Sequence, residues 1–347
     1  MKKIVKQVVG IDVAQKELVV CLGRMLDDWS PELYATRAFP NTKKGFVSLV
    51  SWTKKLTDPL VELRYVMEAT GVYHEQLAYW LDEMGAALSI VLPSKISSYF
   101  RTLEIKTITD KTSSEAIARF ALERKLDTWK RPLPIFKQLR QLSREREQIT
   151  ALRTISKNQL HAEKAQAEPG KGSVARLKRQ IALFDSQLAE IQVELQQLLK
   201  ENAAVKQSVQ RISSIKGIGT QTAAAVLGET NGFELIRSKR QLTSYAGLDV
   251  REKLSGTSVK GKPSISKRGN KHLRKAMYMP ALSAVKHDQH FKALFARLVA
   301  RHGIKMKALV AVQRKLLELM YILHKTQKTY DPNYQENQNK KLVLLNN

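Results

Sequence analysis

Several residue types and patterns are scarce in this 347-residue sequence, and each absence narrows the possible functions. The only cysteine, Cys21, excludes both a disulfide framework and a cysteine-rich zinc site. No run approaches the ~20 uncharged apolar residues that cross a bilayer. The apolar run after the basic start is too short, and too soon interrupted by Asp12, for a signal peptide. We therefore expect a cytoplasmic protein without a membrane partner.

Acidic residues are also scarce. The sequence has 32 Asp and Glu against 59 Lys and Arg, a formal net charge of +27. A hydrophobic content of 43% with 26% charged residues is typical of a globular chain, and the length allows two domains with a core each. A polyanionic partner is the simplest reason to tolerate so much self-repulsion, so the composition predicts nucleic-acid binding.

Hydrophobic periodicity predicts an α/β domain over residues 1–130. Short apolar, β-branched runs predict strands, and apolar residues at helical spacing predict the helices between them. The resulting order, βββαβαβα, is that of a ribonuclease-H-like domain. The predicted strands lie at 5–13, 18–22, 34–39, 65–68 and 88–92.

A helical arm is predicted over residues 131–211. In its second half, apolar residues recur at alternating intervals of four and three residues, which is the spacing of a coiled-coil seam. A second predicted helix comes before it and ends ahead of the helix-breaking segment 169–173. Dimerisation through such an arm is a fair expectation. A mostly helical domain should follow at 212–330, with a flexible tail at 331–347. The seam residues are Leu177, Ile181, Phe184, Leu188, Ile191, Leu195 and Leu198.

Three acidic residues fall where the predicted domain would bring them together. Asp12 lies in the first strand, Glu68 ends the fourth, and Asp110 precedes the last helix. The first and fourth strands are neighbours in a ribonuclease-H-like sheet, so these carboxylates could face one pocket and would repel unless cations such as Mg²⁺ or Mn²⁺ neutralised them. Taken singly, each is more often a solvent-facing or capped group; the set predicts a metal site for phosphodiester chemistry.

The second group of candidates is a serine-containing basic segment. Seven Lys or Arg residues and no acidic ones lie between Lys260 and Lys275, which predicts contact with phosphates, although a solvated basic loop is the ordinary alternative. A nucleophilic serine needs exposure and nearby cations. Ser255, Ser264 and Ser266 all meet these conditions, and residue chemistry does not choose among them. The seven basic residues are Lys260, Lys262, Lys267, Arg268, Lys271, Arg274 and Lys275.

A glycine-containing turn upstream offers a third nucleic-acid contact. Lys216-Gly217-Ile218-Gly219 has the pattern of a helix-hairpin-helix turn, whose glycines let backbone N–H groups approach a phosphate. A plain turn between two helices is the equally weighted alternative.

The motifs occur in the order seen in the insertion-sequence-110 family of transposases, which includes the Piv-type DNA invertases, and the chain resembles that family over nearly its whole length. The resemblance implies a RuvC-like domain with an Asp-Glu-Asp-Asp metal site, a coiled-coil arm and a transposase domain with a catalytic serine. The motifs are Gly10-Ile11-Asp12-Val13, Met67-Glu68-Ala69-Thr70-Gly71, Thr109-Asp110-Lys111, Lys216-Gly217-Ile218-Gly219, Tyr245-Ala246-Gly247-Leu248, Ser255-Gly256 and Ile265-Ser266-Lys267-Arg268-Gly269-Asn270.

Position by position, the resemblance implies that Asp12, Glu68 and Asp110 are metal ligands and Ser255 the nucleophile. It also implies recombination of a mobile insertion sequence in a prokaryote, in association with the nucleoid. The partners would be DNA at the element ends and the target, and a structured bridge RNA as guide. Assembly would be as dimers and tetramers in which one subunit's acidic site meets another's serine.

The sequence departs from the family pattern at one site residue. The fourth acid should lie three residues after Asp110, where this chain has Ser113. Glu115 or water could take the vacant ligand place. Ser113 makes a catalytically impaired nucleic-acid-binding protein one alternative to a serine transposase. The other alternative is a RuvC-like junction nuclease that hydrolyses DNA with metal-activated water and needs no serine.

Overall fold

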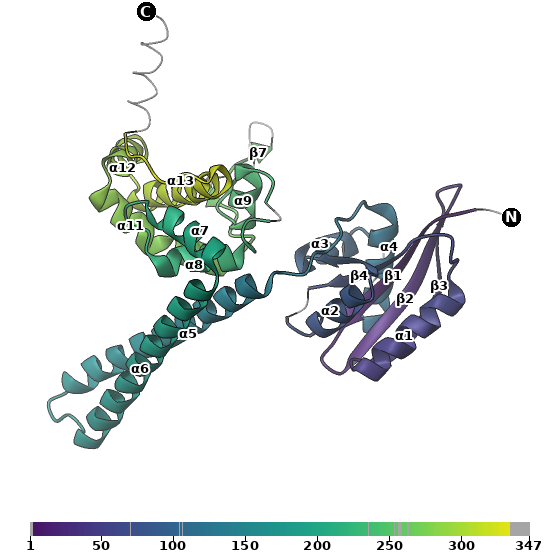
Figure 1. Ribbon diagram of the computed structural model, residues 1–347, viewed down its shortest axis with the longest axis horizontal. Helices are drawn as coiled ribbons and strands as arrows, with labels where there is room; N and C mark the ends of the chain where they lie inside the picture. Colours follow the sequence, from purple (N-terminus) through teal and green to yellow (C-terminus); the bar gives the residue numbers. More distant parts are fainter. Residues whose placement is uncertain are drawn as a thin grey trace, which may run out of the picture. The chain divides into compact units, whose positions relative to one another are not determined.

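The computed structural model describes residues 3–333 except 70, 104, 106, 235, 253, 256–258, 262 and 263, and for 254, 255, 259 and 260 it describes the backbone alone. The chain divides into two compact units, Met1–Arg131 and Pro132–Asn347 (Figure 1). The further division of the second unit into an arm and a C-terminal domain stays a prediction. Most of the predicted tail, 334–347, lies outside the described residues.

The first unit contains a five-stranded mixed sheet of order β3-β2-β1-β4-β5. β2 is antiparallel to β1 and β3, whereas β4 is parallel to β1 and β5. This confirms the predicted mixed α/β unit. The strands are β1 (Ile4–Val13), β2 (Glu17–Leu26), β3 (Pro31–Pro40), β4 (Leu63–Glu68) and β5 (Ala87–Val91).

Four helices cover the two faces of this sheet. Alternate residues of β1 point to opposite faces, so Val9 and Ile11 pack with one apolar cluster and Val8 with another. The first cluster includes Phe46 of α1 and Leu77 of α2, and the second includes Ile117 of α4. The helices are α1 (Lys43–Leu56), α2 (Glu75–Glu83), α3 (Pro93–Phe100) and α4 (Asp110–Glu123).

α4 lies unusually close to β1 because of Gly10. A Cβ atom at this position would lie 2.4 Å from the backbone nitrogen of Ala118 and 2.5 Å from the carbonyl oxygen of Ser114. Only glycine permits this approach of helix and strand. The start of α4 is fixed by a capping box in which Thr109 and Thr112 exchange side-chain and backbone hydrogen bonds. Asp110 is therefore held one turn before the crossing point.

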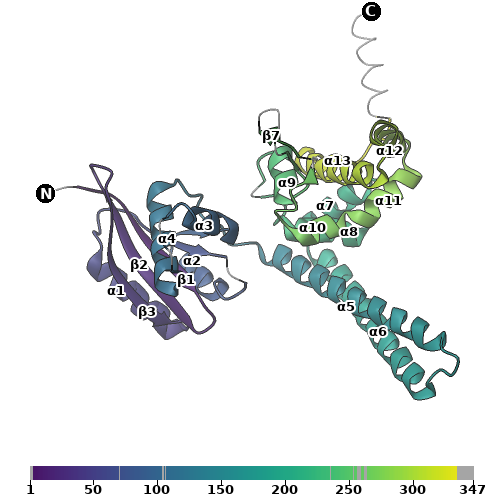
Figure 2. The ribbon, with the colours of Figure 1, turned by 180° about the vertical axis from the view of Figure 1, so that it is seen from behind.

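The second unit is helical. Its two longest helices, α5 and α6, have 31 residues each and lie side by side (Figures 1 and 2). Leu142 and Ile149 of α5 are buried, as are Ile191 and Leu195 of α6, whereas the coiled-coil register itself stays a prediction. The helices are α5 (Pro134–Lys164), α6 (Lys171–Glu201), α7 (Ala203–Ser213), α8 (Thr220–Glu229), α9 (Lys239–Tyr245), α10 (Lys271–Ala276), α11 (Tyr278–His287), α12 (Gln289–His302) and α13 (Lys305–Thr326).

Two short strand pairs interrupt the helices between α9 and α10. β6 (Val250–Arg251) pairs with β9 (Ser264–Ile265), and β7 (Leu254–Ser255) pairs with β8 (Val259–Lys260). Across the part of the chain that the structure covers, no helix combines the length and apolar composition needed to cross a membrane.

Candidate active site and nucleic-acid interface

Asp12 and Glu68 lie at matching positions of neighbouring parallel strands. β1 and β4 are in register up to the pair Ile11 and Met67, so the next residue of each strand is the acidic one. Adjacent strands lie ~4.8 Å apart and matched residues point to the same face. That face is the one covered by α4, because Val8 and Val66 pack in the α4 cluster. The two carboxylates therefore share a sheet edge beneath the start of α4.

Asp110, the first residue of α4, completes the acidic group. The pKa of Asp12 is raised from 3.8 to about 6, first by burial and then by the negative charges of Asp110 and Glu68. A hydrogen bond from the backbone of Val13 opposes the shift. The three carboxylates are thus near enough to repel one another. Their side chains are not grouped as a ready-made ligand set, since no three or more His, Cys, Asp or Glu among the described residues could hold a metal ion.

The position expected for a fourth acid is occupied by Ser113, half-buried on α4 one turn after Asp110. Its backbone N–H donates to the carbonyl oxygen of Thr109 at 2.8 Å. Glu115, the substitute ligand considered from the sequence, is close enough to Cys21 of β2 for its charge to affect the pKa of that thiol. Burial raises the pKa of the Cys21 thiol to about 11, and the charge of Glu115 adds to the shift. Glu115 is not among the charges that shift the pKa of Asp12.

The three candidate serines differ in their surroundings. Ser255 ends β7, where its backbone pairs with that of Val259; its side chain lies outside the described part of the structure. Ser264 is exposed in β9. The Ser266 hydroxyl donates to Asp249 Oδ1 at 2.5 Å, and its backbone N–H donates to the Asp249 carbonyl at 2.8 Å. The Ser266 hydroxyl therefore has an intramolecular role.

Some cations of the basic segment form contacts within the protein. Arg274 Nη1 donates to the carbonyl oxygens of Ala246 and Gly269, at 2.8 and 3.2 Å, and Lys275 Nζ lies 3.0 Å from Glu147 Oε1. Lys267, Arg268 and Lys271 are exposed, whereas Lys262 and the side chain of Lys260 lie outside the described residues. Fewer cations than the sequence suggested are thus available to a phosphate backbone.

The glycine turn between α7 and α8 also proves to have an internal role. Gly217 has φ +95°, and a Cβ there would lie 2.8 Å from the backbone nitrogen of Ala284 in α11. Gly219 precedes α8, with open space around it, and Lys216 is exposed. Gly217 is therefore explained by packing, while Gly219 and Lys216 could contact a phosphate.

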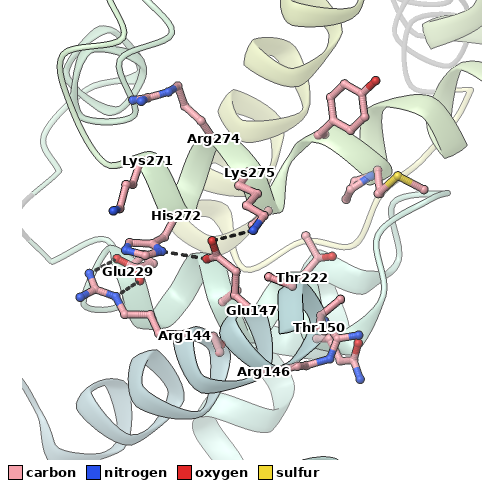
Figure 3. Close-up of a pocket in the computed structure, with 18 of the residues that line it drawn as sticks. Arg144, Arg146, Glu147, Thr150, Thr222, Glu229, Lys271, His272, Arg274 and Lys275 are labelled. Atoms are coloured by element: carbon pink, nitrogen blue, oxygen red, sulfur yellow. Dashed lines mark hydrogen bonds and ion pairs between the residues drawn. The ribbon is translucent and has the colours of Figure 1, made fainter. Parts of the chain in front are cut away.

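The sequence did not predict a cleft of about 1110 Å³ in the second unit (Figure 3). Two glutamates, Glu229 and Glu147, line this cleft. Glu229, 1% exposed, accepts hydrogen bonds from Arg144 at 2.7 and 2.9 Å and from Asn270 at 2.6 Å. Burial alone would raise the pKa of Glu229, but these hydrogen bonds outweigh it and the pKa lies below its ordinary value. Glu147 contacts His272 Nδ1 at 2.8 Å in addition to Lys275. These pairs join residues 85 and 125 positions apart, beyond any local sequence signal.

Comparisons with known proteins match two regions of the chain, the first of which extends from the first unit into α5 of the second. Residues 9–163 match a DEDD transposase domain model, and residues 209–296 match the model described as "Transposase IS116/IS110/IS902 family". Both models describe transposases, enzymes that cut and rejoin DNA strands. The chain belongs to the IS110 family of transposases, as its motifs indicated.

Two curated relatives match along most of their length. The pilin gene-inverting protein of Moraxella lacunata is 27% identical over 95% of this chain and 99% of its own. The transposase for insertion sequence element IS1111A of Coxiella burnetii is 24% identical over 93% of this chain and 91% of its own. Among solved structures, T. thermophilus RuvC in complex with a Holliday junction substrate is 9% identical, covering 35% of this chain and 99% of its own. Its TM-score is 0.27, at which the likeness supports no inference.

Proposed function

We propose that this transposase cuts and exchanges the DNA strands of a mobile insertion sequence with residues from both units. In this mechanism Ser255 Oγ gives up its proton and bonds to the phosphorus of the scissile phosphodiester. The sugar oxygen of the cut strand leaves and takes up a proton. A sugar hydroxyl of a second strand later displaces the serine and restores the phosphodiester. The observation that carries the proposal is the position of Asp12 and Glu68 at one sheet edge beneath Asp110, the first residue of α4. Burial, and then the charges of Asp110 and Glu68, raise the pKa of Asp12.

The donor set at this edge fits a divalent cation. Carboxylate oxygens are the ligands that Mg²⁺ and Mn²⁺ prefer, and a cation would relieve the repulsion that raises the pKa of Asp12. We therefore assign Asp12, Glu68 and Asp110 as the residues that would hold it, within a ribonuclease-H-like, RuvC-like domain. When bound, the ion would supply positive charge to polarise the scissile phosphate. The register of β1 with β4 and the close approach of α4 at Gly10 bring the three residues to the same region of the first unit, which supports this assignment.

Ser255 is preferred over the other two serines for two reasons. It matches the family's serine, and it lies in the two-residue strand β7, which pairs with β8 at the start of the basic segment. Ser266 is engaged with Asp249, so it would have to lose that hydrogen bond before it could attack. Exposed Lys267, Arg268 and Lys271 could contact the DNA near the cut.

The finer features of the family are proposed for this chain as well. A structured bridge RNA would guide the protein to donor and target DNA in the nucleoid, and homodimers or homotetramers would combine one subunit's acidic site with another's serine. The net charge of +27 supports binding of more than one polyanion. The relatives named as inverting proteins support strand exchange rather than cutting alone.

A second candidate function is nucleic-acid binding with impaired catalysis. Ser113 in place of the fourth acid favours it, as does the absence of a ready-made ligand set among the described side chains. A missing carboxylate should weaken metal binding most at the position it would have served.

Covalent trapping tests the proposal. Full-length protein is incubated with MgCl₂, labelled DNA carrying the sequence beside the gene, and RNA transcribed from that sequence, then denatured and run on a gel. We expect a protein–DNA adduct that disappears in Ser255→Ala and persists in the control Ser264→Ala, with DNA affinity unchanged in both. An adduct that survives in Ser255→Ala refutes the assignment. Cutting without any adduct indicates hydrolysis, and neither cutting nor adduct indicates the impaired protein.

A further inference from the structure

The cleft in Figure 3 has the composition of a nucleic-acid contact rather than of a packing defect. It opens between α5, α6, α8, α10, α11 and α13, all in the second unit. Five Lys and Arg side chains and two glutamates line it, a net charge of +3 with His272 neutral. Apolar residues form much of the remaining wall, among them Ile191, Tyr278 and Met306.

Most of the charged groups that line the cleft already have partners. Arg144 binds Glu229, Lys275 and His272 bind Glu147, and Arg274 donates to two carbonyl oxygens. Lys271 is exposed and can be solvated by water. Arg146 differs from all of them.

Arg146 is a half-buried cation without an acceptor. It lines the cleft from α5, and within the described part of the chain it makes no hydrogen bond or ion pair. Burial alone lowers its pKa, with no anion to oppose the shift. A guanidinium has five donors and remains charged in proteins, so partial burial without acceptors is costly to the fold. Such a cost is expected where a ligand supplies the missing anion.

A second unsatisfied donor lies next to Arg146 on the same helix. Thr150 is four residues further along α5, so the two side chains share one face, and Thr150 also lines the cleft. Its Oγ1 atom is buried and has no hydrogen-bond partner among the residues that the structure covers. Threonine in a helix has two accessible rotamers, so its hydroxyl can turn toward a ligand held by Arg146. In Figure 3 the two residues lie together at one end of the cleft.

We propose that Arg146 and Thr150 form a binding subsite for one backbone phosphate of a nucleic-acid strand that enters this cleft. A phosphodiester offers two unesterified oxygens, which fit the planar guanidinium and a neighbouring hydroxyl. The strand belongs to a polyanion of the class that a transposase handles, and the +3 lining favours it over a neutral ligand. This inference rests on family membership alone and is independent of the assignments of Asp12, Glu68, Asp110 and Ser255.

Binding measured against salt tests this subsite. Full-length protein is titrated with a fluorescein-labelled 30-nucleotide DNA duplex, and separately with an RNA hairpin, between 0.05 and 0.3 M NaCl. We expect Arg146→Ala to weaken binding of one of these probes about tenfold and to reduce the slope of log affinity against log salt by ~0.9 for duplex DNA or somewhat less for RNA. Thr150→Val should weaken the same probe with the slope unchanged, because it removes a hydroxyl and no charge. The probe affected identifies the strand as DNA or RNA.

Arg179→Ala is the matched control, because it removes the same charge from an exposed position on α6 outside the cleft. Thermal unfolding separates ligand binding from a structural role. If Arg146 and Thr150 await a ligand, Arg146→Ala and Thr150→Val should be at least as stable as the parent. The proposal would be overturned if Arg146→Ala lost no more affinity than Arg179→Ala, or lost none with either probe. A fall in the Tm of both Arg146→Ala and Thr150→Val would also overturn it.

Discussion

Replacing Asp12 by Asn should stabilise the protein in the absence of divalent cations. The folded-state pKa of Asp12 is raised from 3.8 to about 6, so folding opposes its ionised form. At 1.36 kcal/mol per pKa unit this corresponds to at most ~3 kcal/mol at pH 7.5. Solvent reaches the half-buried side chain, which lowers the expected gain to about 1–2 kcal/mol. Asn keeps the shape of the side chain and removes the charge that Glu68 and Asp110 repel.

The pH dependence follows from the direction of the shift. Between pH 4 and 6 the folded state binds a proton that the unfolded state has released. The loss of folding stability that ionised Asp12 causes in the parent protein is therefore complete above about pH 6 and absent below about pH 4. The stability difference between Asp12→Asn and the parent should be largest at pH 7.5 and vanish near pH 4.

Tryptophan fluorescence during urea denaturation can measure this effect in the full-length chain. All four tryptophans lie in the first unit, at positions 29, 52, 80 and 129, so the signal reports unfolding of the unit that contains Asp12. Asp27→Asn is the control and should change little, because Asp27 is an exposed carboxylate that follows β2 and contacts Lys3 ahead of β1. MgCl₂ should stabilise the parent more than Asp12→Asn. Equal or lower stability of Asp12→Asn at pH 7.5 would refute the electrostatic account of this edge.

Two further substitutions test other parts of the molecule. Ser113→Asp adds a carboxylate one turn after Asp110 and should raise Mg²⁺ affinity about tenfold or more, measured by calorimetry; an unchanged affinity would mean that this position does not face the ion. Glu229→Gln breaks a buried acid–base pair and should destabilise the second unit by about 2–4 kcal/mol in thermal unfolding followed by circular dichroism, since Arg144 is 43% exposed and recovers some hydration. A loss below ~0.5 kcal/mol would show that Asn270 and Arg144 find other acceptors.

The sequence was sufficient to predict the mixed sheet and its acidic edge. Strand periodicity is a local property. Two neighbouring parallel strands that carry an acidic residue at or next to their C-terminal ends bring those residues to one edge of the sheet. Asp12 and Glu68 could therefore be paired in advance. The proximity of Asp110 depends on the crossing of α4 at Gly10, which a helix pattern alone does not specify.

The surroundings of the basic segment could not be read from the sequence. Lys275 and Arg274 look available to a phosphate until α5 and the chain around α9 are placed beside them, where Glu147 and the Ala246 carbonyl engage them. Ser266 likewise looks as free as Ser264 until Asp249 is placed. Such tertiary partners, and the unsatisfied pair Arg146 and Thr150, depend on helix packing over long sequence separations.

In the proposed mechanism the serine of the second unit becomes bonded to the cut DNA. Mass spectrometry of a protease digest of the trapped, nuclease-treated complex tests it most directly. We expect a nucleotide attached to the peptide containing Ser255, formed only with MgCl₂ and lost in Asp12→Asn. A nucleotide on any other serine, or cut ends bearing a free phosphate with all serines unmodified, would contradict it.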